Sequence, residues 1–335
     1  DLGGSVFWCS HCGAVDYAYH SCRNWHCPRC QREATEKWCE KLRDLALPCR
    51  YALVTFTLPG TLRALARSHQ RQVYAILLQA AAASVQALAR DPRWIGGEPG
   101  IVGVLHTWTR DMAYHPHAHL LVTAGGLADD GQSWRLPAHR RFFFPGHALS
   151  VIFRAKVRDA LGHDGILKEV GRQALAGPWV VHVQDAGNGE VVTRYLARYV
   201  YRVALTDDRM ESFAHGQVTF RYRDARTRAV RRMTLPSCDF IARFLQHVLP
   251  RRFVKVRYFG LFAPTRRADL QKARSILESA FPAPIATPAA IPAPRLHPVG
   301  RPCPVCHKGT MRFLQRFARG TPPPSVTPPN TRAPP

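Results

Sequence analysis

The stretch Tyr114-His-Pro-His-Ala-His-Leu-Leu-Val122 has histidines at alternating positions and continues into apolar residues. Side chains of a β-strand alternate between the two faces of a sheet, so His117 and His119 are expected on one face, about 7 Å apart. Two imidazoles at this spacing can hold one divalent metal ion. His115 has the same parity, but Pro116 is expected to end the strand ladder before it. The stretch therefore predicts a metal-binding strand.

A metal ion on this strand needs a third ligand from elsewhere in the chain. His106 is the first choice, because the expected strand from Ile101 to Trp108 precedes the histidine strand and is expected to pair with it. His182 and Gln184 share one face of another expected strand, from Pro178 to Gln184, and are the alternatives.

A pair of tyrosines lies in an expected helix from Glu190 to Leu205. Tyr195 and Tyr199 are one turn apart on the same face, and a parallel stripe of arginines has the same spacing: Arg194, Arg198 and Arg202. Alone, such a tyrosine pair usually packs in a core. Beside a metal strand, a phenolic oxygen becomes a candidate nucleophile for phosphorus, with the cation withdrawing charge from the phosphate.

The other elements indicate a mixed fold. A strand is expected from Tyr51 to Leu58, a long helix from Thr61 to Arg90 with Thr61 as its cap, and a helix from Asp239 to Val248. Strands and helices without strict alternation predict an α+β fold with a mostly antiparallel sheet.

A basic β-hairpin is expected from two runs, Val218 to Arg223 and Arg228 to Leu235. Arg221 and Arg223 flank Tyr222, and interleaved cationic and aromatic groups suit a single nucleic-acid strand, whose bases can stack. An ordinary exposed basic hairpin is the alternative.

Two cysteine pairs near the N-terminus, Cys9-Ser-His-Cys12 and Cys27-Pro-Arg-Cys30, have the spacing of zinc knuckles. We expect Cys9, Cys12, Cys27 and Cys30 to hold one structural Zn²⁺; one ligand could instead be Cys22, His20 or His26. A third pair, Cys303-Pro-Val-Cys306, is half a site. It would bind zinc if His297 or another chain completed it, and would otherwise stay empty.

Composition points to a nucleic-acid partner. The chain has 47 Lys and Arg against 23 Asp and Glu, a net charge of +24, which favours a polyanion. Paired cysteines favour metal binding in a reducing cytosol over disulfides. The most apolar stretch, Val73 to Ala89, is interrupted by Gln79 and Gln86, so no membrane span is expected. We expect a zinc module over residues 1–48, a catalytic domain over 49–270, and a Pro/Ala-rich linker and tail over 271–335.

Together, these motifs resemble the HUH superfamily of single-strand DNA nucleases, and most closely its two-tyrosine IS91-like rolling-circle transposases. The resemblance extends from Cys9 to about Ala263 and includes further runs, Ser21 to Cys30 and Phe240 to Gly260. It implies a ferredoxin-like antiparallel sheet carrying the HUH nuclease core. It also implies that His117 and His119 hold Mg²⁺ or Mn²⁺ against the scissile phosphate.

By the same resemblance, Tyr195 or Tyr199 attacks single-stranded DNA and leaves a 5′-phosphotyrosine link and a free 3′-hydroxyl. The second tyrosine would serve strand transfer. The partners would be single-stranded DNA at the element ends and at the target, in the bacterial cytoplasm at the nucleoid. The chain starts just before the first cysteine pair, so the helical segment that precedes it in the family is expected to be absent.

Three other functions stay open. A plasmid rolling-circle replication initiator or a conjugative relaxase would share the chemistry, although the zinc module favours a transposase. A zinc-dependent DNA-binding protein without catalysis would bind DNA and form no covalent adduct. A metal hydrolase for small substrates is disfavoured by the charge of +24.

Overall fold

The computed structural model describes a chain of two compact units, one comprising residues 1–36 with 287–335 and the other residues 37–286. This division unites both ends of the sequence, whereas three consecutive segments, 1–48, 49–270 and 271–335, were expected. The residues described are 2–20, 38, 41–42, 44–138, 144–177, 179–188, 204–205, 209–224, 226–280, 300 and 302–327.

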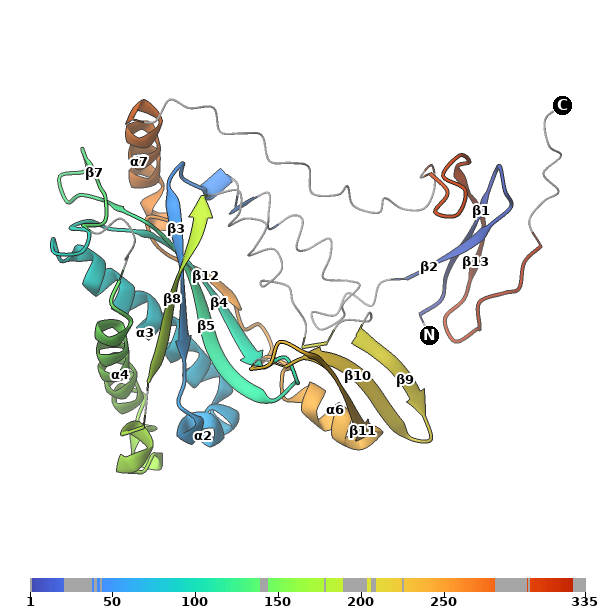
Figure 1. Cartoon of the computed structure of the whole chain (residues 1–335), viewed down its shortest axis with the longest axis horizontal. Helices are drawn as coiled ribbons and strands as arrows, with labels where there is room; N and C mark the ends of the chain where they lie inside the picture. The colour runs from blue at the N-terminus through green and yellow to red at the C-terminus, as the bar shows by residue number, and fades with distance from the viewer. Residues whose placement is uncertain are drawn as a thin grey trace. The chain divides into compact units, whose positions relative to one another are not determined.

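The larger unit is built on a five-stranded antiparallel sheet (Figure 1). The histidine-bearing strand is at its centre, in the order β12 (Val256–Gly260), β4 (Gly100–Trp108), β5 (Tyr114–Thr123), β3 (Arg50–Thr57) and β8 (Val180–Asn188). The predicted pairing of the two central strands is confirmed, because β4 and β5 are antiparallel neighbours.

Two helices cover one face of this sheet (Figure 1), α3 (Gln70–Arg90) and α4 (Gly146–His163). Alternate residues of β5, such as Leu120, are fully buried beneath them, and Phe56 of β3 meets Phe153 of α4 edge-on at 4.9 Å. α3 is long and apolar enough by composition to cross a membrane, but 67% of that stretch is buried in this core. It is therefore a core helix, and the opposite face of the sheet carries the histidines.

The long helix expected from Thr61 to Arg90 is interrupted. A 3₁₀ turn (Gly60–Leu62) and the short α2 (Arg63–Ser68) precede α3. His69, between α2 and α3, has non-helical backbone angles of φ −117° and ψ 47°. Thr61 makes no cap bond; its hydroxyl donates instead to the Ala174 carbonyl at 2.7 Å. The apolar periodicity did not reveal this break because both helices bury apolar residues against the same core.

Pro116 lies inside β5 and does not end it, contrary to expectation. Its carbonyl accepts a bond from the Leu58 N–H at 3.3 Å. On the other side, the pairing of β4 with β5 shifts between His106 and Trp108. Pro116 lacks an N–H where the β4–β5 pairing is already irregular, so few hydrogen bonds between the two strands are lost.

The predicted basic hairpin is confirmed and gains a third strand, giving a sheet of β9 (Met210–Ala214), β10 (Gln217–Arg223) and β11 (Val230–Pro236), followed by α6 (Ser237–Leu245). Phe220 of β10 is buried against Met112 in the turn between β4 and β5. His247, after α6, donates through Nε2 to the Met112 carbonyl at 3.1 Å. The basic sheet thus packs against the turn that leads into β5 (Figure 1).

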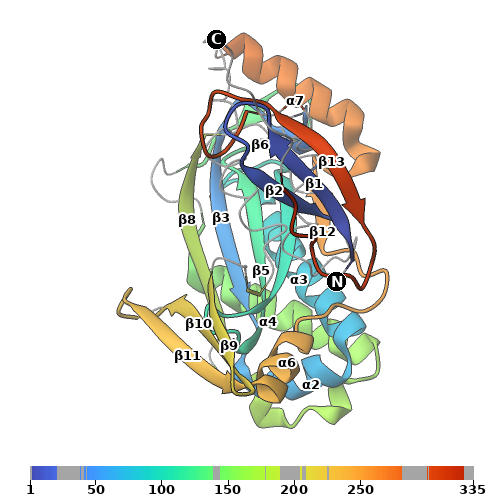
Figure 2. The same ribbon diagram turned by 90° about the vertical axis from the view of Figure 1, so that its right-hand side faces the viewer.

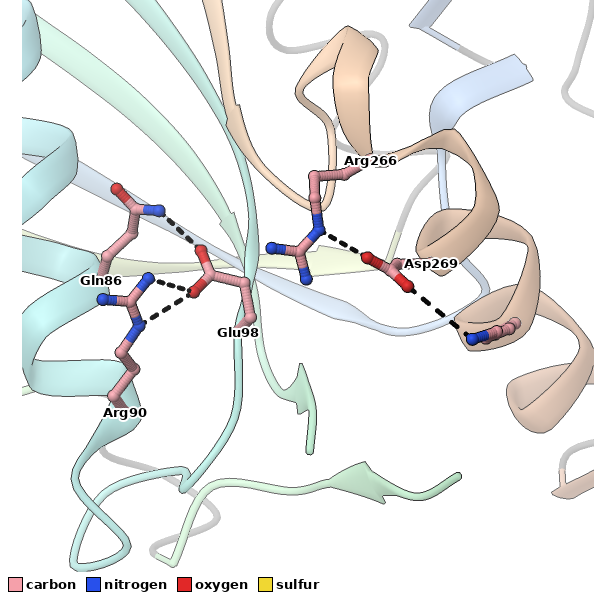
Figure 3. A network of polar contacts seen from close by, with 6 residues as sticks. Gln86, Arg90, Glu98, Arg266 and Asp269 are labelled. Carbon is pink, nitrogen blue, oxygen red and sulfur yellow. Dashed lines mark hydrogen bonds and ion pairs between the residues drawn. The ribbon is translucent and has the colours of Figure 1, made fainter. Parts of the chain in front are cut away.

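A buried carboxylate ties the end of α3 to the segment leading into β4 (Figure 3). Glu98 accepts bonds from Gln86 at 2.6 Å and from Arg90 at 2.9 and 3.1 Å. Nearby, Arg266 pairs with Asp269 at the start of α7 (Arg267–Ala280), a helix that was not predicted. The contacts of Glu98 hold the C-terminal end of α3 against the segment that leads into β4.

The smaller unit contains a three-stranded antiparallel sheet, with β1 (Gly4–Cys9) between β13 (Met311–Phe317) and β2 (Val15–Tyr19) (Figure 2). Among its described residues, the larger unit also contains the strand pair β6 (Gly126–Leu127) and β7 (Trp134–Arg135) and the 3₁₀ turns Leu167–Glu169, Arg172–Leu175 and Pro264–Arg266. The predicted α+β class with antiparallel sheets is confirmed.

Candidate metal centre and nucleic-acid surface

Three histidines converge on the face of the central sheet opposite α3 and α4. His106 lies directly opposite His117 in the β4–β5 register, and Val104 lies opposite His119. The possible ligand nitrogens of the three histidines all lie within 4.8 Å of one another. Ring centroids are 4.8 Å apart for His117 and His119, and 4.8 and 5.5 Å from His106 to His119 and His117. The structure thus brings the first-choice third ligand to the predicted pair.

Hydrogen bonds orient two of these imidazoles. His117 Nδ1 lies 2.7 Å from the His115 carbonyl oxygen, which can only accept, so this nitrogen carries the proton in the neutral ring. Its Nε2 is then the unprotonated nitrogen, whose lone pair can bind a metal ion. His119 Nδ1 lies 3.0 Å from the Thr55 hydroxyl, which can accept a hydrogen bond from a protonated Nδ1. Such bonds to the outer nitrogen are usual for metal-ligating histidines.

Burial also keeps these rings neutral. Burial, together with a smaller effect of neighbouring histidine charge, lowers the pKa of His117 to about 4 and that of His119 to about 3. Neutral imidazole is the form that binds metal. Mg²⁺ prefers oxygen ligands and imidazole suits transition metals better, so Mn²⁺ fits this donor set better than Mg²⁺.

The alternative ligands lie farther away on the same sheet. His182 is opposite Thr55 on β8, so the width of β3 separates it from His119. It is exposed, and so is Gln184, two residues farther along the same strand. Within the residues described, neither belongs to the histidine group.

Sequence reasoning did not single out two groups beside the histidines. The Trp108 ring stacks on His106 with centroids 4.9 Å apart, and Lys255 Nζ lies 5.1 Å from the Trp108 ring centroid. Burial lowers the pKa of Lys255 to about 7. On the other side, Arg63 Nη2 lies 3.0 Å from His115 Nδ1. A lone lysine and a lone arginine carry no spacing signal, so only the fold reveals them.

The tyrosine helix lies outside the described residues. This applies to both candidate nucleophiles and to the arginine stripe: Tyr195, Tyr199, Arg194, Arg198 and Arg202.

The basic sheet separates its arginines from its aromatic residue. Arg221 and Arg223 are exposed on β10, whereas Tyr222 packs toward the apolar cluster around Met112. Charge and ring therefore do not interleave on one surface as expected. Glu211 on β9 forms ion pairs with Arg221 on β10 at 3.3 Å and with Arg232 on β11 at 2.8 Å.

Arg209 joins this sheet to the turn between β4 and β5 by hydrogen bonds. Its guanidinium donates to the Arg221 carbonyl at 2.8 Å and to the Arg110 carbonyl at 2.5 Å. Arg110 lies in the turn that joins β4 to β5. The exposed arginines are thus held at a fixed position beside the start of the histidine strand.

The structure brings Cys9 and Cys12 together with the third cysteine pair. Their sulfurs lie together with those of Cys303 and Cys306, within 4.8 Å of one another. The predicted partners, Cys27 and Cys30, lie outside the described residues, as do Cys22 and His26. Spacing along the chain could not suggest this arrangement, because 297 residues separate Cys9 from Cys306.

Comparison with known proteins gives two family matches. Residues 1–58 match the family described as "Transposase zinc-binding domain", and residues 100–269 match the one described as "Putative transposase". "Putative transposase y4qJ" of Sinorhizobium fredii is 36% identical, over 96% of this chain and 87% of that protein. The chain belongs to the IS91-like transposases. "Transposase for insertion sequence element IS801" of Pseudomonas savastanoi pv. phaseolicola is 30% identical, over 84% of this chain and 72% of its own length.

No solved structure matches this IS91-like transposase. Family membership makes it an enzyme of DNA transposition with DNA as its substrate, in agreement with the charge of +24. The N-terminal zinc-binding domain predicted from the cysteine pairs is part of the same family pattern.

Proposed function

We propose that this transposase nicks and rejoins single-stranded DNA by rolling-circle chemistry at the three-histidine centre. The convergence of His106, His117 and His119 within 4.8 Å carries the proposal. The antiparallel sheet, with helices on one face and histidines on the other, supports a ferredoxin-like HUH core. We further infer that the protein acts in the bacterial cytoplasm.

The three imidazoles would hold a divalent ion, with Mn²⁺ favoured by the donor set. When bound, such an ion polarises a phosphoryl oxygen and stabilises the charge that develops on it during attack. The protein contributes preset ligands: the His115 carbonyl fixes His117 and the Thr55 hydroxyl orients His119. Little rearrangement is then needed when the phosphate arrives.

Tyr195 or Tyr199 would supply the nucleophile. A bond forms between the phenolic oxygen and phosphorus, and the bond from phosphorus to the 3′ oxygen breaks. The leaving oxygen takes a proton and becomes the 3′-hydroxyl, while the 5′ side stays linked to tyrosine. Attack of a 3′-hydroxyl on that link reverses the process and rejoins DNA without an external energy source, so a second tyrosine can serve strand transfer.

The surrounding cations suit an extended phosphate chain. Arg63 lies beside His115 on one side of the centre. The exposed arginines of β10 are anchored next to the same strands through Arg209. Single-stranded DNA crossing the histidine face would therefore meet positive charge from Arg63 and from the β10 arginines.

The test is a covalent-adduct assay. Labelled single-stranded DNA that carries the element's end is incubated with the protein and Mn²⁺ and resolved on a denaturing gel. We expect a protein–DNA band that EDTA abolishes. The band should be lost in the variant with Tyr195→Phe and Tyr199→Phe together, and in His117→Ala with His119→Ala.

A matched control separates the metal centre from general damage to the sheet. His182→Ala removes an exposed histidine two strands away and should keep the band. Tight DNA binding without any adduct would refute the proposal and favour a zinc-dependent DNA-binding protein. A replication initiator or relaxase would form the adduct on a plasmid origin and not on the element's end.

A further inference from the structure

Two CxxC pairs from distant parts of the sequence meet in the smaller unit. Cys9 Sγ lies 3.7 Å from Cys306 Sγ, and Cys12 Sγ lies 3.7 Å from Cys303 Sγ. Four sulfurs bound tetrahedrally to one zinc ion at about 2.3 Å lie about 3.8 Å from one another. A disulfide would need about 2.05 Å. The sulfur spacing is therefore that of a metal tetrathiolate.

The two pairs have the same local backbone. In each, the first cysteine sulfur accepts backbone N–H bonds from the residues two and three positions later, at 3.3 and 3.4 Å in one pair and 3.3 and 3.5 Å in the other. Four residues after each first cysteine, Gly13 and His307 have positive φ angles of 71° and 56°. N–H groups directed at sulfur favour the thiolate, which is the form that binds metal.

The second pair is shaped to receive the first. A Cβ atom added at Gly309 would lie 2.5 Å from Cys9 Sγ and 2.5 Å from the His11 Cβ. Both distances are far shorter than van der Waals contact, so only glycine permits this approach. The Gly309 N–H also donates to Cys306 Sγ at 3.4 Å.

Strand pairing and packing hold the four cysteines together. β1 and β13 pair antiparallel, and this pairing places Cys9 opposite Met311. Cys9, Cys303, Met311 and Phe7 form one buried cluster. The site thus lies at the end of a folded sheet: Cys9 ends β1, Cys12 lies in the turn after it, and Cys303 and Cys306 lie in the segment before β13.

We propose that one Zn²⁺ is bound by Cys9, Cys12, Cys303 and Cys306, so that residues near the C-terminus complete the zinc-binding domain. The matched zinc-binding family region ends at residue 58, so it includes Cys9 and Cys12 but neither Cys303 nor Cys306. A closed four-sulfur site has no open position, so its role is structural. Cys27 and Cys30 are not ligands of this ion. The inference is independent of the DNA-cleavage chemistry.

Metal stoichiometry in the purified full chain tests the proposal. Zinc is measured by elemental mass spectrometry, and Co²⁺ is substituted to read the absorption of a tetrathiolate. Changing Cys9 and Cys12 to serine should remove one equivalent of metal. Changing Cys303 and Cys306 should remove the same equivalent, and changing all four should remove no more than one. Cys238→Ser, an exposed cysteine on α6, is the control and should keep the full content.

A second variant retains every ligand. Gly309→Ala should lower zinc affinity at least tenfold in a chelator competition, whereas Gly171→Ala, where a Cβ meets nothing within 4 Å, should not change it. Full metal content after changing Cys303 and Cys306 would overturn the proposal. The proposal would also fail if changing Cys27 and Cys30 removed the same equivalent of metal as changing Cys9 and Cys12, while changing Cys303 and Cys306 did not. Iron in place of zinc would overturn the choice of metal.

Discussion

Thr55 offers a sharp test of the histidine centre, because it touches a proposed ligand without being one. Its hydroxyl lies 3.0 Å from His119 Nδ1. Thr55→Val keeps the branched shape but leaves that nitrogen without this partner, so His119 is less firmly held in the tautomer that presents Nε2. Loss of such outer contacts costs about 10- to 100-fold in metal affinity, or about 1.4 to 2.7 kcal/mol.

We expect the lower end of that range, because the His115 carbonyl still presets His117. The assay is a Mn²⁺ titration followed by electron paramagnetic resonance of the free ion, in which the Kd should rise about tenfold. Thr57→Val is the matched control. Thr57 lies opposite His117 on the same strand as Thr55, and among the described residues no hydrogen bond joins it to a histidine. An unchanged Kd in Thr55→Val, or an equal rise in Thr57→Val, would refute the reasoning.

Three further predictions concern stability and DNA binding. Glu98→Gln should lower the free energy of unfolding in urea by about 2 kcal/mol, because a buried charged acceptor of two side chains is lost; an unchanged midpoint would contradict this. Burial lowers the pKa of Lys255 to about 7, so between pH 7 and 10 the unfolded chain holds more protons and stability should rise with pH. Lys255→Met should flatten that rise, and an unaltered slope would count against it. Arg223→Gln should reduce the salt dependence of single-strand binding by about 0.7 in log–log slope if Arg223 contacts one phosphate; no change would place the DNA elsewhere.

The sequence was sufficient to predict the histidine centre because strand parity is a local property. His117 and His119 share a face from their spacing alone, and pairing with the preceding strand brought His106 to them. The choice between His106 and His182 was harder, since it depends on strand order. β3 lies between β5 and β8 and so separates His182 from the other histidines, and the local sequence around Thr55 does not indicate this strand order.

Three other features depend on contacts that spacing along the chain cannot reveal. Pro116 continues its strand because the neighbouring strand shifts register at that point, which is a property of the pair. Cys303 and Cys306 join Cys9 and Cys12 across 297 residues, beyond the reach of any motif spacing. Tyr222 turns inward because Met112, more than a hundred residues earlier, provides the apolar surface on which it packs.

The pairing of β1 with β13 also sets an order in time. A ribosome adding about 5 to 20 residues per second needs roughly 15 to 60 s to synthesise the 297 residues between Cys9 and Cys306. Throughout that interval β1 has β2 as a neighbour, but its other edge is unpaired and Cys9 and Cys12 lack their partners. A chain released early would therefore carry an open strand edge and two unmatched thiols, whereas only a full-length product could close this sheet.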